Sequence, residues 1–463
     1  MSIFDQTKVL FARHAWLVDG WVDNARIHWN DQGDISQIET NVASDPDDHI
    51  EQFVVPGMIN LHSHAFQRAM AGMTEIAGSG PDSFWTWRDL MYRFALAINP
   101  EQIQSIAAQL YSECLRFGYT SVCEFHYLHR APSGDFYANI AETSQRVLNA
   151  AEQTGIGITL LPVLYTYADF NEYPLNPNQR RFSTNPEQLL KIVRALEPQR
   201  SGQVEIGVAP HSIRAAALED IAEVVAALPS DRPIHIHIAE QQKEVDNCVA
   251  SSGKRPVELL FDAQSSSNPV NERWCLVHAT HLSASEVTQI AQSKAVAGIC
   301  TTTEGNLGDG FFDLPAFIAQ QGRFGIGSDS HVSQSPIEEL RWLEYGQRLR
   351  AQRRNMSAVG EQKHIGDFLW KSALQGGMQA SGRKVGSIEV GKRADLLVLD
   401  AKHPNLSGIA CSDVLNTWIF TGNDNLVHDV LVGGQWRVKE GRHVNQVAIE
   451  QRFKQTMQQL RAL

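Results

Sequence analysis

The segment Val54-Val55-Pro56-Gly57-Met58-Ile59-Asn60-Leu61-His62-Ser63-His64 contains an apolar run, a Pro-Gly breaker pair and two histidines. The breaker pair ends one predicted strand, and the histidines follow the next apolar run. Side chains two residues apart on an extended chain point the same way, so His62 and His64 can present both imidazoles to one metal ion. A His-x-His pair alone is equally typical of two solvated loop histidines. Other segments of the sequence are needed to distinguish a metal site from solvated histidines.

A second histidine-bearing strand is predicted at Ile234-His235-Ile236-His237-Ile238-Ala239-Glu240. Imidazoles on an apolar strand are costly unless they are bound or hydrogen-bonded. His237 is nearer the carboxyl end and is the better metal ligand, whereas His235 is expected to be a hydrogen-bonded core histidine. Glu240 lies beyond the strand, where its carboxylate can reach a metal-bound water.

Two further segments have the same form. Residues 276–281 place His278 at the end of an apolar strand, and residues 324–331 place Asp329 after a strand whose glycines allow close backbone approach. Each of the four segments is weak evidence by itself. Together they put metal-binding and acid–base side chains at the carboxyl ends of successive strands, where (β/α)8 barrels assemble their active sites. Seven further histidines are expected to be solvated, namely His14, His28, His49, His364, His403, His428 and His443.

The surrounding chain shows an alternating pattern. Between residues 58 and 385, short apolar runs alternate with segments of helical periodicity such as 103–117, which predicts an α/β protein with a (β/α)8 TIM-type barrel as its catalytic domain. Residues 1–57 and 386–463 contain short strands, and neither part is long enough to bury a core alone. We therefore expect both termini to form one small β-sandwich domain, followed by an amphipathic helix at 447–460 that packs against the chain or a partner.

Composition excludes several classes of protein. The 463 residues carry 40 Lys and Arg against 52 Asp and Glu, a net charge of −12, which argues against nucleic-acid and anionic-membrane partners. The mean hydropathy is −0.25, and we find no apolar run long enough to predict a membrane span. Asp5 and Lys8 interrupt the start of the chain, which argues against a secretion signal. The six cysteines are scattered, as is typical of reduced thiols, so a cytoplasmic protein is expected.

Five motifs are similar to those of the amidohydrolase superfamily: PGMINLHSH, HIHIAE, LVHATH, IGSDS and GSIEVGKRADLLVLD. The resemblance covers essentially the whole chain and implies a distorted (β/α)8 barrel with a small β domain built from both termini. The absence of Lys from residues 204–212 argues against the two-metal type with a carboxylated lysine, so the set resembles the mononuclear deaminase branch. The resemblance implies one divalent ion, with Zn²⁺ the first choice although iron and other divalent ions also suit this set, held by His62, His64, His237 and Asp329.

Longer blocks are similar to a narrower family, the formimidoylglutamate deiminases, and include HSHAFQRAMAG, DSFWTWRDLMYR, EGNLGDG and IGSDSHVSQSPIEELRWLEYGQRL. This resemblance implies hydrolysis of N-formimino-L-glutamate to N-formyl-L-glutamate and ammonia, a step of histidine degradation. Glu240 is expected to act as general base on water and then as general acid on the leaving nitrogen. His278 and Asp329 are expected to orient the water and stabilise the charge that develops.

Such a substrate would bring two carboxylates into an acidic protein. Arginine binds carboxylates with two parallel hydrogen bonds, and the resemblance implies this role for Arg88 and Arg214. For either arginine alone, a surface ion pair is the alternative. Gln67 and Tyr127 are candidates for hydrogen bonds to the ligand, with a helix-surface position and a core aromatic as their alternatives, and His211 could touch the substrate.

Two other functions stay open at this point. A deaminase or chlorohydrolase of a neutral purine, pyrimidine or triazine would share the metal site, but it does not explain the two arginines. A non-catalytic barrel scaffold would be expected to have lost metal ligands, and the sequence retains all of them. We further expect the chain to form a homodimer, because many barrels of this type pair through their helices.

Overall fold

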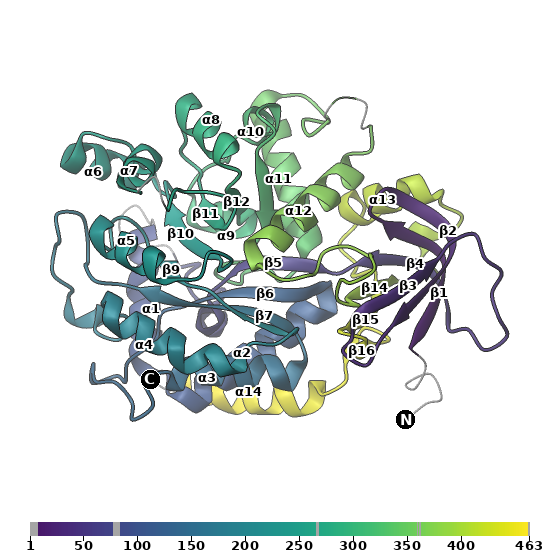
Figure 1. Cartoon of the computed structure of the whole chain (residues 1–463), viewed down its shortest axis with the longest axis horizontal. Coiled ribbons are helices and arrows are strands. Elements are labelled where there is room, and N and C mark those ends of the chain that lie inside the picture. Colours follow the sequence, from purple (N-terminus) through teal and green to yellow (C-terminus); the bar gives the residue numbers. More distant parts are fainter. Residues whose placement is uncertain (1–7, 77–83, 265–267, 359, 361–362, 462–463) are drawn as a thin grey trace.

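The computed structural model describes residues 8–76, 84–264, 268–358, 360 and 363–461. Parallel strands form a barrel in the left and central part of Figure 1. In chain order these strands are β5 (Met58–Ser63), β6 (Tyr119–His126), β7 (Gly157–Leu164), β8 (Val204–Ile206) with β9 (Ala209–Pro210), β10 (Ile234–Ile238), β11 (Trp274–His278), β12 (Val296–Ile299) and β13 (Arg323–Ile326).

The barrel closes through single bridges rather than continuous ladders. Hydrogen-bonded pairing joins β5 through β8 in one sheet and β10 through β13 in another. Parallel bridges Ser63↔Asp329 and Ser212↔His237 connect the two sheets on opposite sides of the ring. The fourth strand is interrupted at Gly207, where an added Cβ would lie 2.4 Å from the Pro233 carbonyl oxygen. The predicted (β/α)8 barrel is therefore present in a distorted form.

Helices surround the barrel strands (Figure 1). The predicted helix at 103–117 begins earlier, at Pro100, because the Asn99 side chain accepts a hydrogen bond from the backbone N–H of Gln102 and caps the first turn. The helices of this region are α1 (Phe84–Ala97), α2 (Pro100–Phe117), α3 (Glu142–Thr154), α4 (Pro186–Leu196), α5 (Leu218–Ala227), α6 (Gln242–Ser252), α7 (Pro256–Ala263), α8 (Ala284–Ser293), α9 (Thr301–Leu307), α10 (Leu314–Ala319), α11 (Pro336–Ala351) and α12 (Ile365–Ser381).

Both ends of the chain contribute to a second sheet, on the right in Figure 1. In the described part of the chain it is one eight-stranded sheet of order β17-β16-β15-β14-β4-β1-β2-β3. It encloses a small apolar core of its own, so the predicted β-sandwich is built from a single continuous sheet. Its strands are β1 (Val9–Leu17), β2 (Gly20–Trp29), β3 (Ile35–Glu39), β4 (Ile50–Pro56), β14 (Leu396–Leu399), β15 (Val427–Val432), β16 (Gln435–Lys439) and β17 (Arg442–His443), with helix α13 (Val414–Phe420) between β14 and β15.

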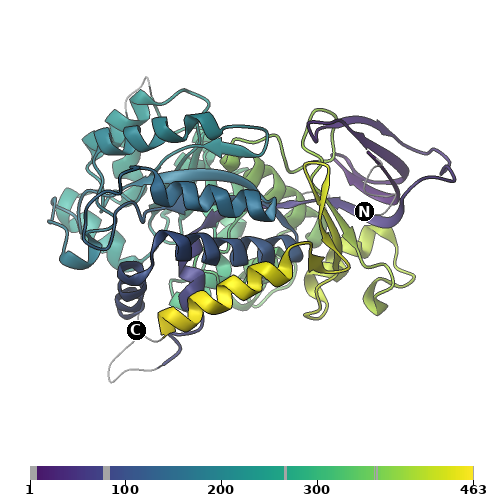
Figure 2. The ribbon, with the colours of Figure 1, turned by 90° about the horizontal axis from the view of Figure 1, so that it is seen from below.

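The last helix, α14 (Gln446–Arg461), leaves this sheet and lies along α2 of the barrel (Figure 2). Gln102 donates a hydrogen bond of 2.9 Å to Gln459 across the contact, and the Arg68 guanidinium lies 5.6 Å from the centre of the Phe453 ring. The amphipathic segment thus covers a barrel helix, which is one of the two roles expected for it.

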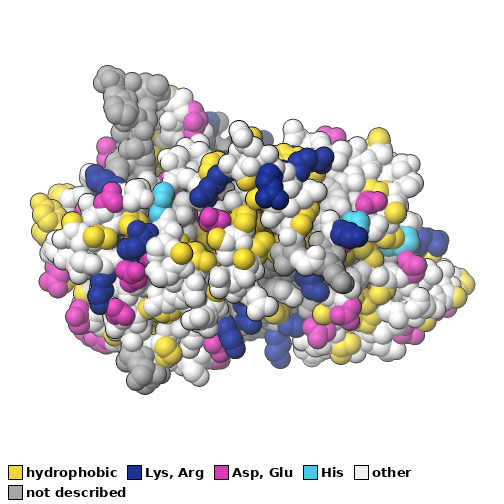
Figure 3. All heavy atoms as spheres, turned by 90° about the horizontal axis from the view of Figure 1, so that it is seen from above, with side chains coloured by type: hydrophobic (Ala, Val, Ile, Leu, Met, Phe, Trp, Pro, Cys, Tyr) yellow, Lys and Arg dark blue, Asp and Glu magenta, His cyan; other side chains and the backbone are white. Residues whose placement is uncertain are grey.

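The surface mixes both signs of charge. On the face shown in Figure 3, lysine and arginine side chains are interspersed with aspartate and glutamate. Among the described residues, no helix combines the length and the apolar character that crossing a bilayer requires.

Candidate metal centre and active site

Four predicted metal ligands meet in one buried cluster. The Nε2 atoms of His62 and His64 lie 3.1 Å apart, and Nε2 of His237 lies 3.0 Å from Nε2 of His62. Oδ1 of Asp329 lies 3.3 Å from Nε2 of His62 and 3.3 Å from Nε2 of His64. The ligand atoms of all four residues lie within 4.8 Å of one another. The ends of β5, β10 and β13 therefore converge as the barrel geometry predicts.

Hydrogen bonds to backbone carbonyls fix the rings. His64 Nδ1 donates to the Phe125 carbonyl over 2.9 Å, and His237 Nδ1 donates to the His211 carbonyl over 2.9 Å. The proton is therefore on Nδ1, and Nε2 of both rings presents a lone pair to the cluster. Lone pairs and a carboxylate oxygen 3.0 to 3.3 Å apart repel each other unless a cation lies among them. Three imidazoles and a carboxylate form a donor set that fits a divalent metal ion.

The histidines of the cluster are neutral at pH 7. Burial lowers the pKa of His64, and burial together with the neighbouring imidazoles lowers the pKa of His62 and His237 well below the usual value of 6.5. Because a metal ion binds the unprotonated ring, this environment favours ligation over protonation.

The backbone brings Asp329 against the His-x-His turn. The Asp329 N–H donates to the His62 carbonyl over 3.0 Å, and the His64 N–H donates to the Asp329 carbonyl over 3.3 Å. Asp329 adopts a φ of 48°, which costs energy for a non-glycine residue and is tolerated where the surroundings enforce it. A Cβ on Gly327 would lie 2.8 Å from the His62 backbone nitrogen. This confirms the expectation that glycine here allows close approach.

Acid–base side chains lie beside the cluster. Nε2 of His278 is 3.7 Å from Oε1 of Glu240 and 3.8 Å from Oδ2 of Asp329. Burial raises the pKa of Glu240 to about 7. Burial opposes a charge on His278, but Glu240, Glu304 and Asp329 outweigh it and raise its pKa to about 10. A buried carboxyl group that titrates near neutral pH is suited to moving a proton in both directions.

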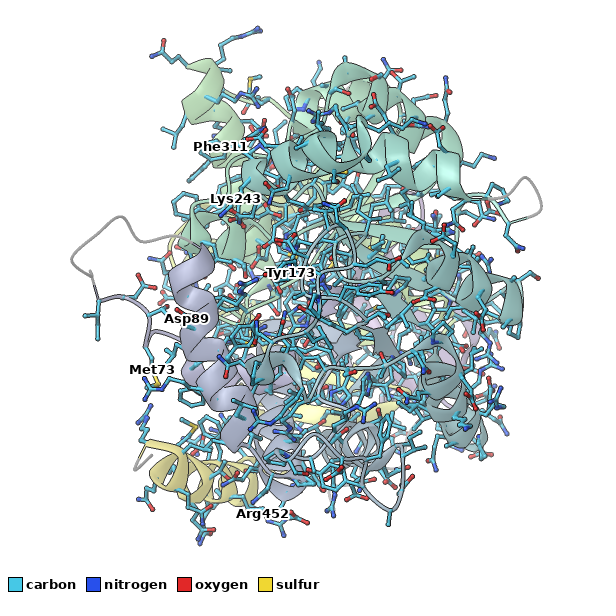
Figure 4. The ribbon with its side chains drawn as sticks, turned by 90° about the vertical axis from the view of Figure 1, so that its left-hand side faces the viewer. Met73, Asp89, Tyr173, Lys243, Phe311 and Arg452 are labelled. Atoms are coloured by element: carbon cyan, nitrogen blue, oxygen red, sulfur yellow. The ribbon has the colours of Figure 1, made fainter. Side chains whose placement is uncertain are left out.

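Three of the four cluster residues, His64, His237 and Asp329, line a pocket that encloses about 560 Å³ of empty space, part of it open to solvent. Every residue predicted to contact substrate lines it, namely Arg88, Arg214, Gln67, Tyr127 and His211. Figure 4 views the barrel from the side of the segments that follow the strands, with Asp89 of α1 and Lys243 of α6 labelled.

Several of these pocket residues contact one another. Gln67 donates a hydrogen bond of 2.8 Å to the Tyr127 hydroxyl. The Arg88 guanidinium lies 5.5 Å from the centre of the Tyr92 ring. His211 packs edge-on against Tyr165, with ring centres 4.7 Å apart. Gln67 and Tyr127 are therefore pocket residues, and neither lies on a helix surface or within the core alone.

Sequence reasoning missed other parts of the site. Glu304 on α9 lies 3.3 Å from Nδ1 of His278 and helps to set the charge of that ring. Tyr92, Tyr165 and Phe182 form much of the pocket wall. Glu304 and Tyr92 had a signal in the sequence, because they lie in the blocks EGNLGDG and DSFWTWRDLMYR, whereas Tyr165 and Phe182 lie outside the quoted blocks. His235 fulfils its prediction, since its Nε2 donates to the Ala380 carbonyl over 2.8 Å.

A (β/α)8 barrel with a buried three-histidine, one-aspartate cluster and an adjacent Glu–His pair defines a metal-dependent hydrolase of the barrel class. The amidohydrolase family model matches residues 53–437, and the model described as "Formimidoylglutamate deiminase HutF, N-terminal domain" matches residues 7–52. The chain therefore belongs to the amidohydrolase family.

Relatives agree with this assignment. The chain is 50% identical to the formimidoylglutamate deiminase of Pseudomonas aeruginosa over 97% of this chain and 99% of that protein. A crystal structure of an amidohydrolase from Brucella melitensis superposes with a TM-score of 0.93 and 44% identity, covering 98% of this chain and 100% of that one. A zinc-bound adenosine deaminase from Xanthomonas campestris, 19% identical, shares the fold with a TM-score of 0.81 and covers 98% of both chains.

Proposed function

We propose that this protein is a formimidoylglutamate deiminase, which hydrolyses N-formimino-L-glutamate to N-formyl-L-glutamate and ammonia in histidine degradation. The observation that carries the proposal is one pocket that joins the metal-ligand cluster to two arginines, Arg88 and Arg214. A cationic wall in a protein of net charge −12 suits a dicarboxylate substrate better than a neutral heterocycle. The near full-length similarity to the Pseudomonas aeruginosa enzyme supports the same substrate.

His62, His64, His237 and Asp329 would hold one divalent ion, for which Zn²⁺ is our first choice. Such an ion supplies the Lewis acidity that makes water a nucleophile near neutral pH. The same donor set also accepts iron and other divalent ions, so the identity of the metal is part of the test.

Glu240 carries the proton through the reaction. Its carboxylate takes a proton from the attacking water as a new C–O bond forms at the formimino carbon. It then gives a proton to the nitrogen that leaves as ammonia when the C–N bond breaks. His278 and Asp329 orient the water and stabilise the developing charge. Nε2 of His278 lies between the two carboxylates, 3.7 Å from Oε1 of Glu240 and 3.8 Å from Oδ2 of Asp329.

The remaining pocket residues bind the two parts of the substrate, its glutamate carboxylates and its formimino group. Arg88 and Arg214 would each pair with a substrate carboxylate, because a guanidinium can donate two parallel hydrogen bonds to it. Gln67 and Tyr127, which are already hydrogen-bonded to each other, would orient the formimino group together with His211.

We place the catalytic domain at residues 58–385 and the small β domain at residues 1–57 and 386–463, with the enzyme acting as a cytoplasmic homodimer. Light scattering of the purified chain would test the dimer, for which the expected mass is twice the 51.5 kDa of one chain.

An ammonia-release assay separates the functions. The metal-loaded protein is incubated with N-formimino-L-glutamate, guanine, cytosine and adenine, each with a chelator-treated control. We expect ammonia from formimino-glutamate alone. Release from a neutral base instead would favour a nucleobase deaminase, and no release from any substrate would favour a non-catalytic scaffold.

A further inference from the structure

We infer that Glu124 is a positioning residue of the metal centre, because its carboxylate ends a directed hydrogen-bond chain that fixes the two strand ends bearing His62, His64 and Asp329. The inference rests on the proposed function in one respect, since it takes this cluster to hold a metal ion. It concerns a carboxylate outside the pocket lining, to which the proposed reaction gives no role.

Glu124 lies on β6 behind the His-x-His turn and is only 1% exposed. Its Oε2 accepts hydrogen bonds from the Ser63 hydroxyl over 2.6 Å and from the Tyr111 hydroxyl over 3.0 Å. Its Oε1 accepts a bond of 2.7 Å from the Ala65 backbone N–H. Ser63 is the residue between the two histidine ligands, and Ala65 follows the second one. One carboxylate therefore binds the residues on both sides of the ligand His64.

The direction of the chain is set at its other end, on the Asp329 side. The Ser328 backbone N–H donates to Oδ1 of Asn60 over 3.0 Å, which fixes the orientation of the Asn60 amide. The Asn60 amide nitrogen then donates to the Ser328 hydroxyl oxygen over 2.6 Å. The Ser328 hydroxyl hydrogen is left to donate to Nδ1 of His331, 3.0 Å away.

The hydrogen-bond chain continues from His331 to the Glu124 carboxylate with the same donor-to-acceptor order. Because Nδ1 of His331 accepts, its Nε2 carries the proton and donates to the Ser63 hydroxyl oxygen over 3.2 Å. Ser63 passes its own hydrogen to Glu124. Ser328 precedes the ligand Asp329, so the chain connects the two ligand-bearing strand ends through side chains.

Replacing the carboxylate by an amide of the same shape should disturb this order. In Glu124→Gln, the Ala65 N–H keeps the amide oxygen facing it, and the NH₂ group then faces the Ser63 hydroxyl, where the wild type has an acceptor. Ser63 can no longer donate to residue 124, so the donor–acceptor order of the hydrogen bonds must reverse, from Ser63 to His331 and from His331 to Ser328. The Ser328 oxygen already receives the Asn60 N–H. In the reversed order the Ser328 oxygen would also receive the His331 N–H, and the Ser328 hydroxyl hydrogen would lose Nδ1 of His331 as its acceptor. This buried donor is left without a partner, and the turn that bears the ligands must shift to relieve it.

The matched control is Glu344, an equally buried carboxylate on α11. It accepts backbone N–H bonds from Met356 over 2.8 Å and from Ser357 over 3.0 Å, and it is not part of the metal-ligand cluster. Glu344→Gln should lower the thermal stability of the protein without changing its metal affinity.

The test is the zinc affinity of the full chain, measured by competition with a chromophoric chelator for the wild type, E124Q, S63A and E344Q. We expect E124Q to bind zinc about 10- to 100-fold more weakly, the range seen when partners of metal ligands are replaced. S63A, which cuts the chain but keeps the carboxylate, should also bind more weakly, and E344Q should match the wild type. A merely structural role for Glu124 would lower the unfolding temperature of the metal-free protein without weakening zinc binding.

Wild-type zinc affinity in both E124Q and S63A would overturn the inference. If E124Q does not fold, S63A decides alone. Wild-type protein that binds no zinc would instead contradict the proposed metal centre, so failure of that proposal and failure of this inference give different results.

Discussion

The metal-ligand cluster and the substrate side of the pocket are built in different ways. The cluster is made by strand ends: His62 and Asp329 belong to paired segments whose backbones exchange hydrogen bonds. On the substrate side, Arg88 is on a helix and Arg214 follows a two-residue strand, so both are carried by segments that come after the strands. Strand register therefore fixes the positions of the metal ligands, whereas the segments that follow the strands determine which substrate can bind beside the metal site.

The strongest test of this division is Asp329→Asn. The amide keeps the shape of the side chain but removes the carboxylate charge from the cluster, so turnover should fall below detection. Ammonia release is the measurement, with circular dichroism to show that the barrel stays folded. Substantial activity in a folded variant would remove Asp329 from the mechanism.

Glu240→Gln should separate proton transfer from metal binding. Loss of a general acid–base typically lowers the rate about 10²- to 10⁴-fold, and we expect kcat to fall by this amount. Glu240 is outside the ligand cluster, so the zinc content measured by elemental analysis should not change. A variant with normal kcat would assign the proton transfer to another group.

Arg214→Ala tests the substrate side alone. Loss of a charged hydrogen bond should weaken substrate binding by about 1.5–3 kcal/mol, while kcat and metal content change little. The measurement is KM for formimino-glutamate. Arg273→Ala is the control, because Arg273 lies outside the pocket and donates to the Pro229 carbonyl over 3.3 Å. An unchanged KM in the Arg214 variant would contradict the carboxylate role.

The smallest effect is expected in the pH profile. Burial raises the pKa of Glu240 to about 7, and the base must be ionised to accept a proton from water. The value of kcat/KM should therefore fall as pH drops through about 7, with full activity on the alkaline side. An acid limb near 4.5, the usual pKa of glutamate, would show that burial does not control this group.

The position of the metal-ligand cluster could be predicted from sequence because its signals are local, whereas the choice of these four residues as the ligand set came from the family resemblance. The period of two along a strand pairs His62 with His64, and the rule that barrel sites form at carboxyl strand ends brings His237 and Asp329 to the same place. These relations need no knowledge of distant contacts.

Other features depend on contacts between distant segments. Nothing near Glu124 in sequence shows that its carboxylate binds Ser63, 61 residues away. The prediction that His443 is solvated was wrong: it is 3% exposed and donates to the Thr154 carbonyl over 2.9 Å, because the terminal sheet packs against the barrel helices.

The most direct test of the central proposal combines elemental analysis with ammonia release on one preparation of the wild-type chain. We predict about one divalent ion per chain, as in mononuclear hydrolytic sites, and ammonia from N-formimino-L-glutamate that is lost on chelation and restored by the metal. Protein that carries no metal, or that releases ammonia equally well after chelation, would contradict the proposal.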